Sequence, residues 1–185
     1  MKPIFLIGYM GSGKSTLGHA LSKATGLTFI DLDTYIENRY RKTIRDIFAE
    51  RGEEGFRKLE KAMLEEVSSF EDVIVACGGG TPCFFNNMEV MNACGTTVLL
   101  DATIESLHRR LCHGKAKRPL IAGMTDDELR GYIAEALAKR MPHYALAQHT
   151  FPSDHLEDIR QIRHSVERFI EQLGLTCKAA SNTAI

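Results

Sequence analysis

What the sequence lacks sets the first limits on its function. No run of its 185 residues approaches the ~20 consecutive apolar residues that a membrane-spanning helix needs, so we expect no membrane span. The five cysteines include no CxxC pair, and the seven histidines show no HExxH spacing, so we expect neither disulfides nor a zinc site. With 23 Lys+Arg against 24 Asp+Glu, the chain also lacks the positive excess typical of nucleic-acid binding through phosphates.

The composition is that of an ordinary globular protein, with 44% hydrophobic and 25% charged residues. We expect one domain over residues 1–175, followed by a small, polar tail at 176–185 that is disordered. The opening stretch runs from a short apolar segment straight into glycines and Lys14, which is unlike a signal peptide. Together with the cysteine pattern, this predicts a cytoplasmic protein.

Short apolar runs alternate with helical patterns along the chain, which predicts an α/β fold with a parallel sheet covered by helices. The expected strands are Ile4–Ile7, 28–32, 73–77 and 96–100. The stretch 34–70 is expected to be helical and divided near Gly52 and Gly55.

Three further helices are expected from their periodicity and their end signals. The first follows the glycines near the amino terminus and ends at Gly26. Thr125 and Glu128 have capping-box spacing for a helix that runs to about 148 and is interrupted near Pro142. The last helix ends before residue 174, with capping roles expected for 154 and 157.

A phosphate-binding motif lies between the first strand and the first helix. Gly8, Gly13, Lys14 and Ser15 satisfy GxxxxGK[ST], in which backbone N–H groups and a helix N-terminus hold phosphate oxygens. Lys14 is expected to reach the β- and γ-phosphates, and the Ser15 hydroxyl to bind Mg²⁺. The expected nucleotide contacts are Gly11, Ser12, Gly13, Lys14, Ser15 and Thr16 in this loop, and Arg118 further along the chain.

The class of nucleotide-binding protein follows from what accompanies this motif. Neither the NKxD nor the DxxG string of regulatory GTPases occurs in the sequence. Residues 112–124 are basic, contain a proline and lack apolar periodicity, which favours a surface loop or mobile lid. A small single domain with such a lid is typical of a small-molecule kinase, in which closure excludes water from the transferred phosphoryl group.

At this level of detail the chain resembles the shikimate kinases over residues 2–173. The residues that carry the resemblance are GYMGSGKST, Asp31-Leu32-Asp33, Phe56-Arg57, Gly78-Gly79-Gly80, Arg118-Pro119-Leu120, and Arg140 followed by Tyr144. The resemblance implies a P-loop kinase fold of nucleoside-monophosphate-kinase type, with a five-stranded parallel sheet, flanking helices and a mobile lid. It also implies a monomer that transfers the ATP γ-phosphate to the 3-hydroxyl of shikimate, in the route to chorismate and the aromatic amino acids.

Two aspartates follow the second expected strand. If the strand spans 28–32, alternation puts Asp31 and Asp33 on one face, at the carboxyl end where ligands of open parallel sheets bind. Asp31 is then a candidate Mg²⁺ ligand, and Asp33 a candidate to orient or deprotonate the attacking hydroxyl. The alternative is that one of them caps the next helix.

Three arginines and a glycine complete the candidate site. Arg57 and Arg140 are candidate anchors for a carboxylate, although Arg57 lies in a charged run typical of solvated residues and Arg140 could simply snorkel. Gly79, by resemblance, contacts the substrate; the alternative is a strand-ending turn. Arg118, in the lid, is expected to neutralise phosphate charge in the transition state, acting with Lys14 and Asp33 as the catalytic set.

Three functional hypotheses remain open at this stage. The first is a shikimate kinase that requires Mg²⁺ and ATP. The second is a kinase for another small hydroxy acid, such as gluconate, because a pocket for a carboxylate and a hydroxyl is not unique to shikimate. The third is an ATP-binding module without turnover. The residues that contact adenine are left unassigned.

Overall fold

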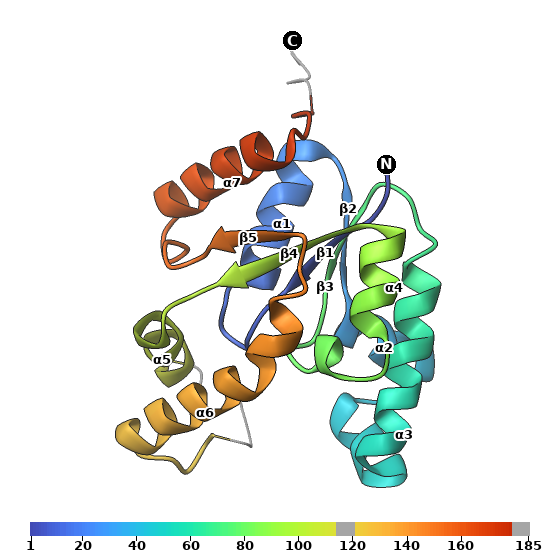
Figure 1. Ribbon diagram of the computed structural model, residues 1–185, viewed down its shortest axis with the longest axis vertical. Coiled ribbons are helices and arrows are strands. Elements are labelled where there is room, and N and C mark those ends of the chain that lie inside the picture. The colour runs from blue at the N-terminus through green and yellow to red at the C-terminus, as the bar shows by residue number, and fades with distance from the viewer. Residues whose placement is uncertain (114–120, 179–185) are drawn as a thin grey trace.

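The computed structural model describes residues 1–113 and 121–178, and its centre is a five-stranded parallel sheet in the order β2-β3-β1-β4-β5 (Figure 1). The strands are β1 (Ile4–Ile7), β2 (Thr28–Asp31), β3 (Val73–Ala76), β4 (Thr96–Asp101) and β5 (His149–Pro152). The fold class predicted from the sequence is therefore confirmed. The pattern did not reveal β5, an edge strand of four residues that ends in a proline.

Helices cover both faces of this sheet because side chains alternate along each strand. Ile4 and Leu6 of β1 pack into one core with α1 (Lys14–Thr25) and α7 (Ile159–Leu173). Phe5 and Ile7 point the other way. They pack into a second core with three helices, α2 (Leu32–Tyr40), α3 (Ile44–Val67) and α4 (Asn87–Cys94).

A third core joins α5 (Ile104–Cys112) to α6 (Asp126–Tyr144), which lie to one side of the sheet where β4 ends (Figure 1). Tyr9, directly after β1, belongs to this cluster and connects it to the sheet. The predicted lid at 112–124 falls between these two helices. Its residues 114–120, Arg118 included, lie outside the described part of the chain, as do residues 179–185 of the predicted tail.

The helix ends follow the predicted signals in one case and depart from them in another. At α6 the capping box is confirmed: Thr125 Oγ1 accepts from the Glu128 N–H at 3.3 Å, and the Glu128 carboxylate accepts from the Thr125 N–H. The helix ends at Tyr144, earlier than expected. For α7 the prediction was wrong, because the cap is Asp158, which accepts from the Gln161 N–H at 2.9 Å.

The two residues expected to cap α7 are occupied elsewhere. Asp154 accepts from the N–H and hydroxyl of Thr103, at 2.9 and 2.8 Å, and so holds the start of α5 against the segment after β5. Glu157 pairs with the arginines of α5. Both acids therefore tie two distant segments together, which a local spacing rule does not detect.

A break in α3 lies where the sequence indicated one. Gly52 has φ 66° and ψ −177°, a backbone conformation that essentially only glycine adopts, whereas Gly55 continues the helix. Among the described residues, no helix is long and apolar enough to cross a membrane.

Candidate active site

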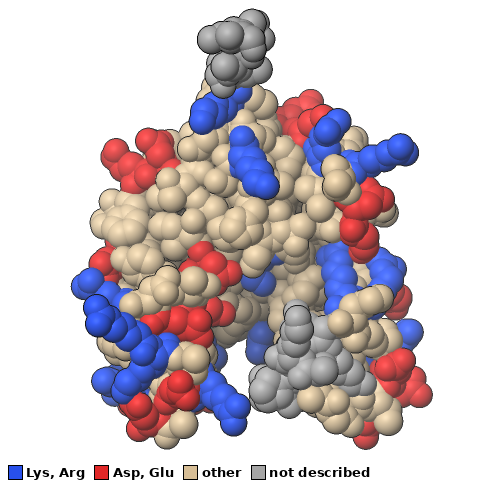
Figure 2. Space-filling model, turned by 180° about the vertical axis from the view of Figure 1, so that it is seen from behind, with Lys and Arg blue, Asp and Glu red and all other residues tan. Residues whose placement is uncertain are grey.

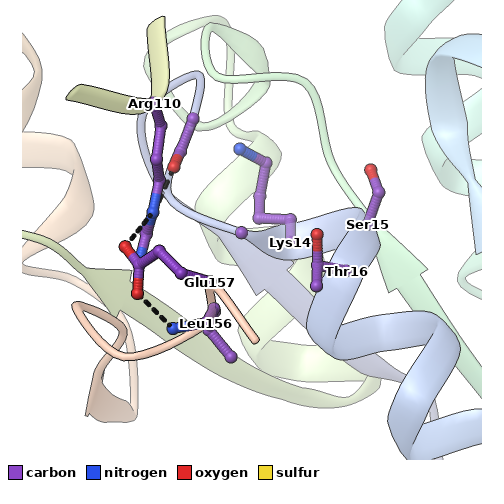
Figure 3. Close-up of a pocket in the computed structure, with 8 residues that line it drawn as sticks. Lys14, Ser15, Thr16, Arg110, Leu156 and Glu157 are labelled. Atoms are coloured by element: carbon purple, nitrogen blue, oxygen red, sulfur yellow. Dashed lines mark hydrogen bonds and ion pairs between the residues drawn. The ribbon is translucent and has the colours of Figure 1, made fainter. Parts of the chain in front are cut away.

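The phosphate-binding loop runs from β1 into α1 and requires glycine at its bends. Gly8 and Gly13 have φ values of 140° and 94°, and a β-carbon at Gly8 would lie 2.7 Å from the carbonyl oxygen of Leu100. Beside the loop lies a cavity of about 370 Å³ (Figure 3). It is lined by Gly11, Gly13, Lys14, Ser15, Thr16, Arg110, Leu156 and Glu157.

Of the six nucleotide contacts expected in the loop, five line this cavity, and Ser12 does not. The Ser12 side chain is buried, and its N–H donates to the Tyr9 carbonyl at 3.1 Å, so this residue shapes the loop from within. Lys14 reaches back over the loop, where its Nζ donates to the carbonyls of Gly8 and Tyr9 at 2.8 and 2.9 Å. Burial lowers the pKa of Lys14 to about 8, against the opposing effect of Asp33 and other neighbours.

Ser15 and Asp31, the two predicted metal ligands, are brought together. The Ser15 hydroxyl donates to Asp31 Oδ2 at 3.1 Å, while Asp31 Oδ1 accepts from the Thr34 N–H at 3.2 Å and caps α2. The capping alternative and the ligand prediction thus use different oxygens of one carboxylate. A hydroxyl and a carboxylate oxygen beside the phosphate cavity are the hard donors that Mg²⁺ prefers, so these residues fit the ion.

The predicted strand 28–32 is one residue too long, so the strand alternation expected to put Asp31 and Asp33 on one face does not apply. The strand β2 ends at Asp31 and the helix begins at Leu32, because the Asp31 cap starts α2 before another strand residue can form. Asp33 therefore projects from the first turn of α2 toward the loop after β3. A β-carbon built at Gly78 would lie 3.1 Å from Asp33 Oδ1.

The surroundings of Asp33 favour its protonated form. Asp33 is exposed to water, yet protein atoms crowd its carboxylate, and the acids Asp31 and Glu60 lie close enough to act on it. Desolvation is the largest cause and these two charges add to it, raising the pKa of Asp33 to about 6 against the opposing effect of Lys14. A carboxylate with this pKa can accept a proton near neutral pH.

The three glycines after β3 each lie against one predicted acceptor-binding residue. Gly78 faces Asp33, as described. A β-carbon at Gly79 would lie 3.1 Å from Arg140 Nη1, and one at Gly80 would lie 2.7 Å from Arg57 Nη2. Side chains from α2, α3 and α6 therefore converge on one glycine turn, where any added side chain would displace them.

Arg57 is fixed by residues that sequence reasoning missed. Its Nη1 lies 2.7 Å from Oε2 of Glu60, a carboxylate only 1% exposed, whose other oxygen accepts from the Thr81 hydroxyl at 2.6 Å. The guanidinium carbon lies 4.0 Å from the Phe84 ring centroid. Arg57 is thus held in place rather than solvated. The available signal was the i, i+3 spacing of Arg57 and Glu60, which other acids in the same run obscure.

Arg140 is positioned by two tyrosines. Its guanidinium carbon lies 5.2 Å from the Tyr9 ring centroid, and Tyr144 lies one turn further along α6. The buried Tyr144 hydroxyl donates to the Gly79 carbonyl at 2.6 Å, and burial raises the pKa of Tyr144 to about 12. Tyr144 therefore does more than pack beside Arg140, because it holds the turn on which Arg140 acts.

Arg110 and Glu157 form the other end of the nucleotide cavity, and neither was identified from the sequence. Arg110 Nη1 donates to the Gly11 carbonyl at 3.2 Å, and its Nε and Nη2 lie 3.1 and 3.0 Å from Glu157 Oε1 (Figure 3). Its Nη2 also donates to the carbonyls of Ser153 and Asp154. This arginine closes the cavity between the phosphate loop and the segment after β5.

Positive charge gathers where these elements meet. Figure 2 shows a hollow in the lower half of the molecule, with Lys and Arg atoms visible in its depth. Lys14, Arg57 and Arg140 all lie around the glycine turn and the phosphate loop. The near-neutral sum over the whole chain therefore conceals a site in which these three cations lie close to the acids Asp31, Asp33 and Glu60.

Comparison with known proteins agrees with this geometry. The family model described as shikimate kinase matches residues 10–173. The chain is 56% identical to the shikimate kinase of Phocaeicola vulgatus over 174 residues, which are 94% of this chain and 99% of that protein.

Solved structures give the same result. The crystal structure of shikimate kinase from Bacteroides thetaiotaomicron has a TM-score of 0.91 and 52% identity, covering 94% of this chain and 99% of that one. Shikimate kinase from Acinetobacter baumannii in complex with shikimate has a TM-score of 0.80 and 29% identity, covering 94% of both chains. Since the family match spans most of the sequence and close relatives align over nearly their whole length, the chain belongs to the shikimate kinase family.

Proposed function

We propose that this protein transfers the γ-phosphate of ATP to the 3-hydroxyl of shikimate, giving 3-phosphoshikimate and ADP for aromatic amino acid biosynthesis. One observation carries the proposal beyond family membership: the phosphate loop touches the glycine turn. The Gly8 carbonyl accepts from Lys14 at 2.8 Å and lies 3.4 Å from the β-carbon position of Gly79. The phosphate donor and the acceptor site thus share one boundary.

On the donor side, the loop amides and Lys14 hold the phosphates, and Arg110 with Leu156 bounds the cavity at its nucleoside end. Lys14 exchanges its contacts with the Gly8 and Tyr9 carbonyls for phosphate oxygens. Arg118 keeps its proposed role of neutralising phosphate charge, as part of a lid at 112–124. Ser15 and Asp31 hold Mg²⁺, which neutralises charge on the phosphates when bound.

On the acceptor side, Arg57 and Arg140 bind the carboxylate of the substrate, because paired guanidinium donors match its two oxygens. Asp33 orients the hydroxyl and accepts its proton. The hydroxyl oxygen forms a bond to the γ-phosphorus as the bond from that phosphorus to the β–γ bridging oxygen breaks, and ADP leaves. Gly79 contributes backbone contact beside Arg140.

The experiment that tests this function is a coupled ADP-release assay with shikimate, Mg²⁺ and folded protein. We expect shikimate-dependent turnover far above the rate of ATP hydrolysis by water. A panel of substrates that contains gluconate and other hydroxy acids tests the alternative that the protein is a kinase for another acid. In that case turnover would depend on that acid and not on shikimate. Nucleotide binding without turnover on any acid would instead support the non-catalytic module.

We further propose that the enzyme is a cytoplasmic monomer with a single domain and no nucleic-acid or membrane partner. Five cysteines that are all free thiols are typical of a reducing compartment. A sedimentation or light-scattering mass near 20.7 kDa would support the monomer, and twice that mass would contradict it.

A further inference from the structure

A histidine, a cysteine and an aspartate that do not line the nucleotide cavity gather at the junction of α5 and α6. His108 and Cys112 are separated by one helical turn and lie on the same side of α5. Asp126 is the first residue of α6 and faces them. One ligand atom from each side chain lies within 4.8 Å of the other two.

The donor atoms lie close to the spacing of ligands around a tetrahedral zinc ion. Cys112 Sγ lies 3.5 Å from His108 Nε2, 3.9 Å from His108 Nδ1 and 3.8 Å from Asp126 Oδ1, so the sulfur lies against the imidazole ring. Bond lengths of about 2.3 Å to sulfur and 2.0–2.2 Å to nitrogen or oxygen place such atoms about 3.5–3.6 Å apart around a tetrahedral ion. The donor atoms are therefore near the required spacing, and a rotation of the imidazole ring about its Cβ–Cγ bond would direct a nitrogen lone pair at the ion.

The chemistry of the donors also selects the kind of metal. A thiolate and an imidazole favour borderline-soft ions such as Zn²⁺, whereas the oxygen pair of Ser15 and Asp31 favours Mg²⁺. His108 is 8% exposed, and its ring packs against the thiol of Cys112. A buried imidazole beside a thiol is a restrained ligand pair, which reduces the entropy lost when a metal binds.

We propose that His108, Cys112 and Asp126 form a Zn²⁺ site that joins the last turn of α5 to the first turn of α6, with water as the fourth ligand. Binding replaces the proton of the Cys112 thiol by the metal and releases that proton to solvent. The search for CxxC and HExxH strings missed this site because it mixes His and Cys at i, i+4 and takes its third ligand from the next helix.

The test is metal binding by the full-length protein without nucleotide or Mg²⁺, so that the kinase site does not contribute. Zn²⁺ is titrated against a chromophoric chelator, and Co²⁺ is used as a spectroscopic probe. We expect one Zn²⁺ per chain, and with Co²⁺ a thiolate-to-metal charge-transfer band together with the intense visible bands of four-coordinate cobalt. Zn²⁺ should also raise the melting temperature, because it binds the folded state.

Matched variants assign the ligands. Cys112→Ser and Asp126→Asn should each weaken Zn²⁺ binding by about 100-fold or more, since even supporting residues of metal sites change affinity by about 10–100-fold. Cys112→Ser should also abolish the charge-transfer band. Two control variants remove groups outside the proposed site. Cys177→Ser removes an exposed thiol, and Asp127→Asn removes the acid next to Asp126 in the sequence. Both should bind Zn²⁺ with the affinity of the wild type. Wild-type affinity and spectra in Cys112→Ser, or loss of binding in Cys177→Ser instead, would overturn the proposal.

Discussion

At the residue scale, the pKa of Asp33 determines how activity responds to acid. A general base must be ionised, and the folded protein raises the pKa of this carboxyl to about 6. Activity is therefore retained above this value and lost as the pH falls through it. We expect kcat/KM for shikimate, measured at saturating MgATP, to fall about tenfold per pH unit below 6.

Substitution of Asp33 checks that this acid limb belongs to Asp33. Asp33→Asn should lower kcat by ~10²–10⁴-fold, the usual contribution of a positioned base, and should remove the acid limb from the residual activity. ADP affinity should stay unchanged. Asp127→Asn, an exposed carboxylate on α6, serves as the control and should keep both the rate and the profile. An unaltered acid limb in Asp33→Asn would assign the titration to another group.

The proposed anchor role of Arg140 predicts a loss that is confined to the acceptor. Arg140→Ala should weaken shikimate binding by about 10- to 150-fold, because a hydrogen bond to a charged group contributes about 1.5–3 kcal/mol. ADP affinity, measured by calorimetry on the same protein, should change little. Arg130→Ala removes an exposed arginine from the same helix and should leave both affinities intact. Equal loss of both ligands in Arg140→Ala would contradict the assignment.

At the scale of the element, α3 and α6 offer a matched pair of glycines. Among the described residues, a β-carbon at Gly52 or at Gly131 would meet no atom within 4 Å beyond its own stretch of backbone, so there is space for alanine at both positions. Only the backbone differs, since Gly52 has φ 66° and Gly131 is helical. Gly52→Ala should lower the free energy of unfolding by about 1–3 kcal/mol, and Gly131→Ala should raise it by about 0.5–1 kcal/mol.

Urea unfolding followed by circular dichroism measures both changes. Because Arg57 follows the break in α3, Gly52→Ala should also raise KM for shikimate, whereas Gly131→Ala should not. If Gly52→Ala stabilises the protein, the break is not required by the fold, and a continuous α3 is equally good.

The start of a helix could be predicted where residues within one turn determine it. The end of an element could not be predicted where two local patterns overlap or where distant residues bind the capping side chain. The capping box at Thr125 acts over one turn, so its spacing is sufficient evidence for a helix start. By contrast, Asp33 fits a strand by alternation, but the Asp31 cap ends β2 first. The acids before α7 satisfy capping spacing, yet Thr103, Arg109 and Arg110 recruit them from far along the chain.

At the scale of the whole molecule, the candidate site also contains residues with a local sequence signal and residues without one. The phosphate loop is contiguous and could be found from its motif, Asp31 and Asp33 were suggested by their place after a strand, and Arg57, Gly79 and Arg140 depended on the family resemblance. Arg110 and Glu60 were missed because nothing local distinguishes them from solvated charges. Arg110 becomes part of the cavity through the Gly11 carbonyl, 99 residues away in sequence. Glu60 becomes buried only when Thr81 and Arg57 close over it.

The arrangement of the site also predicts how the molecule unfolds. The nucleotide cavity takes side chains from α1, α5 and the segment after β5, so it exists only when these elements are packed together. If residues 1–175 form one domain, urea should unfold the protein in a single transition, coincident by circular dichroism and by tyrosine fluorescence, as the chain has no tryptophan. ADP at 100 times its Kd should then add about 2.7 kcal/mol to the whole transition.

The variant Lys14→Met tests whether ADP stabilises the protein by binding in the nucleotide cavity or by a nonspecific effect. Removing the ammonium that the loop holds for phosphate should weaken ADP binding, so the same ADP concentration should add little to the free energy of unfolding. Lys23→Met, on the same helix but outside the nucleotide cavity, should retain the full increment. Two transitions, of which ADP shifts only one, would mean that α5 and α6 fold apart from the sheet. The single-domain proposal would then fail, because the third core around Tyr9 would not be coupling those helices to β1.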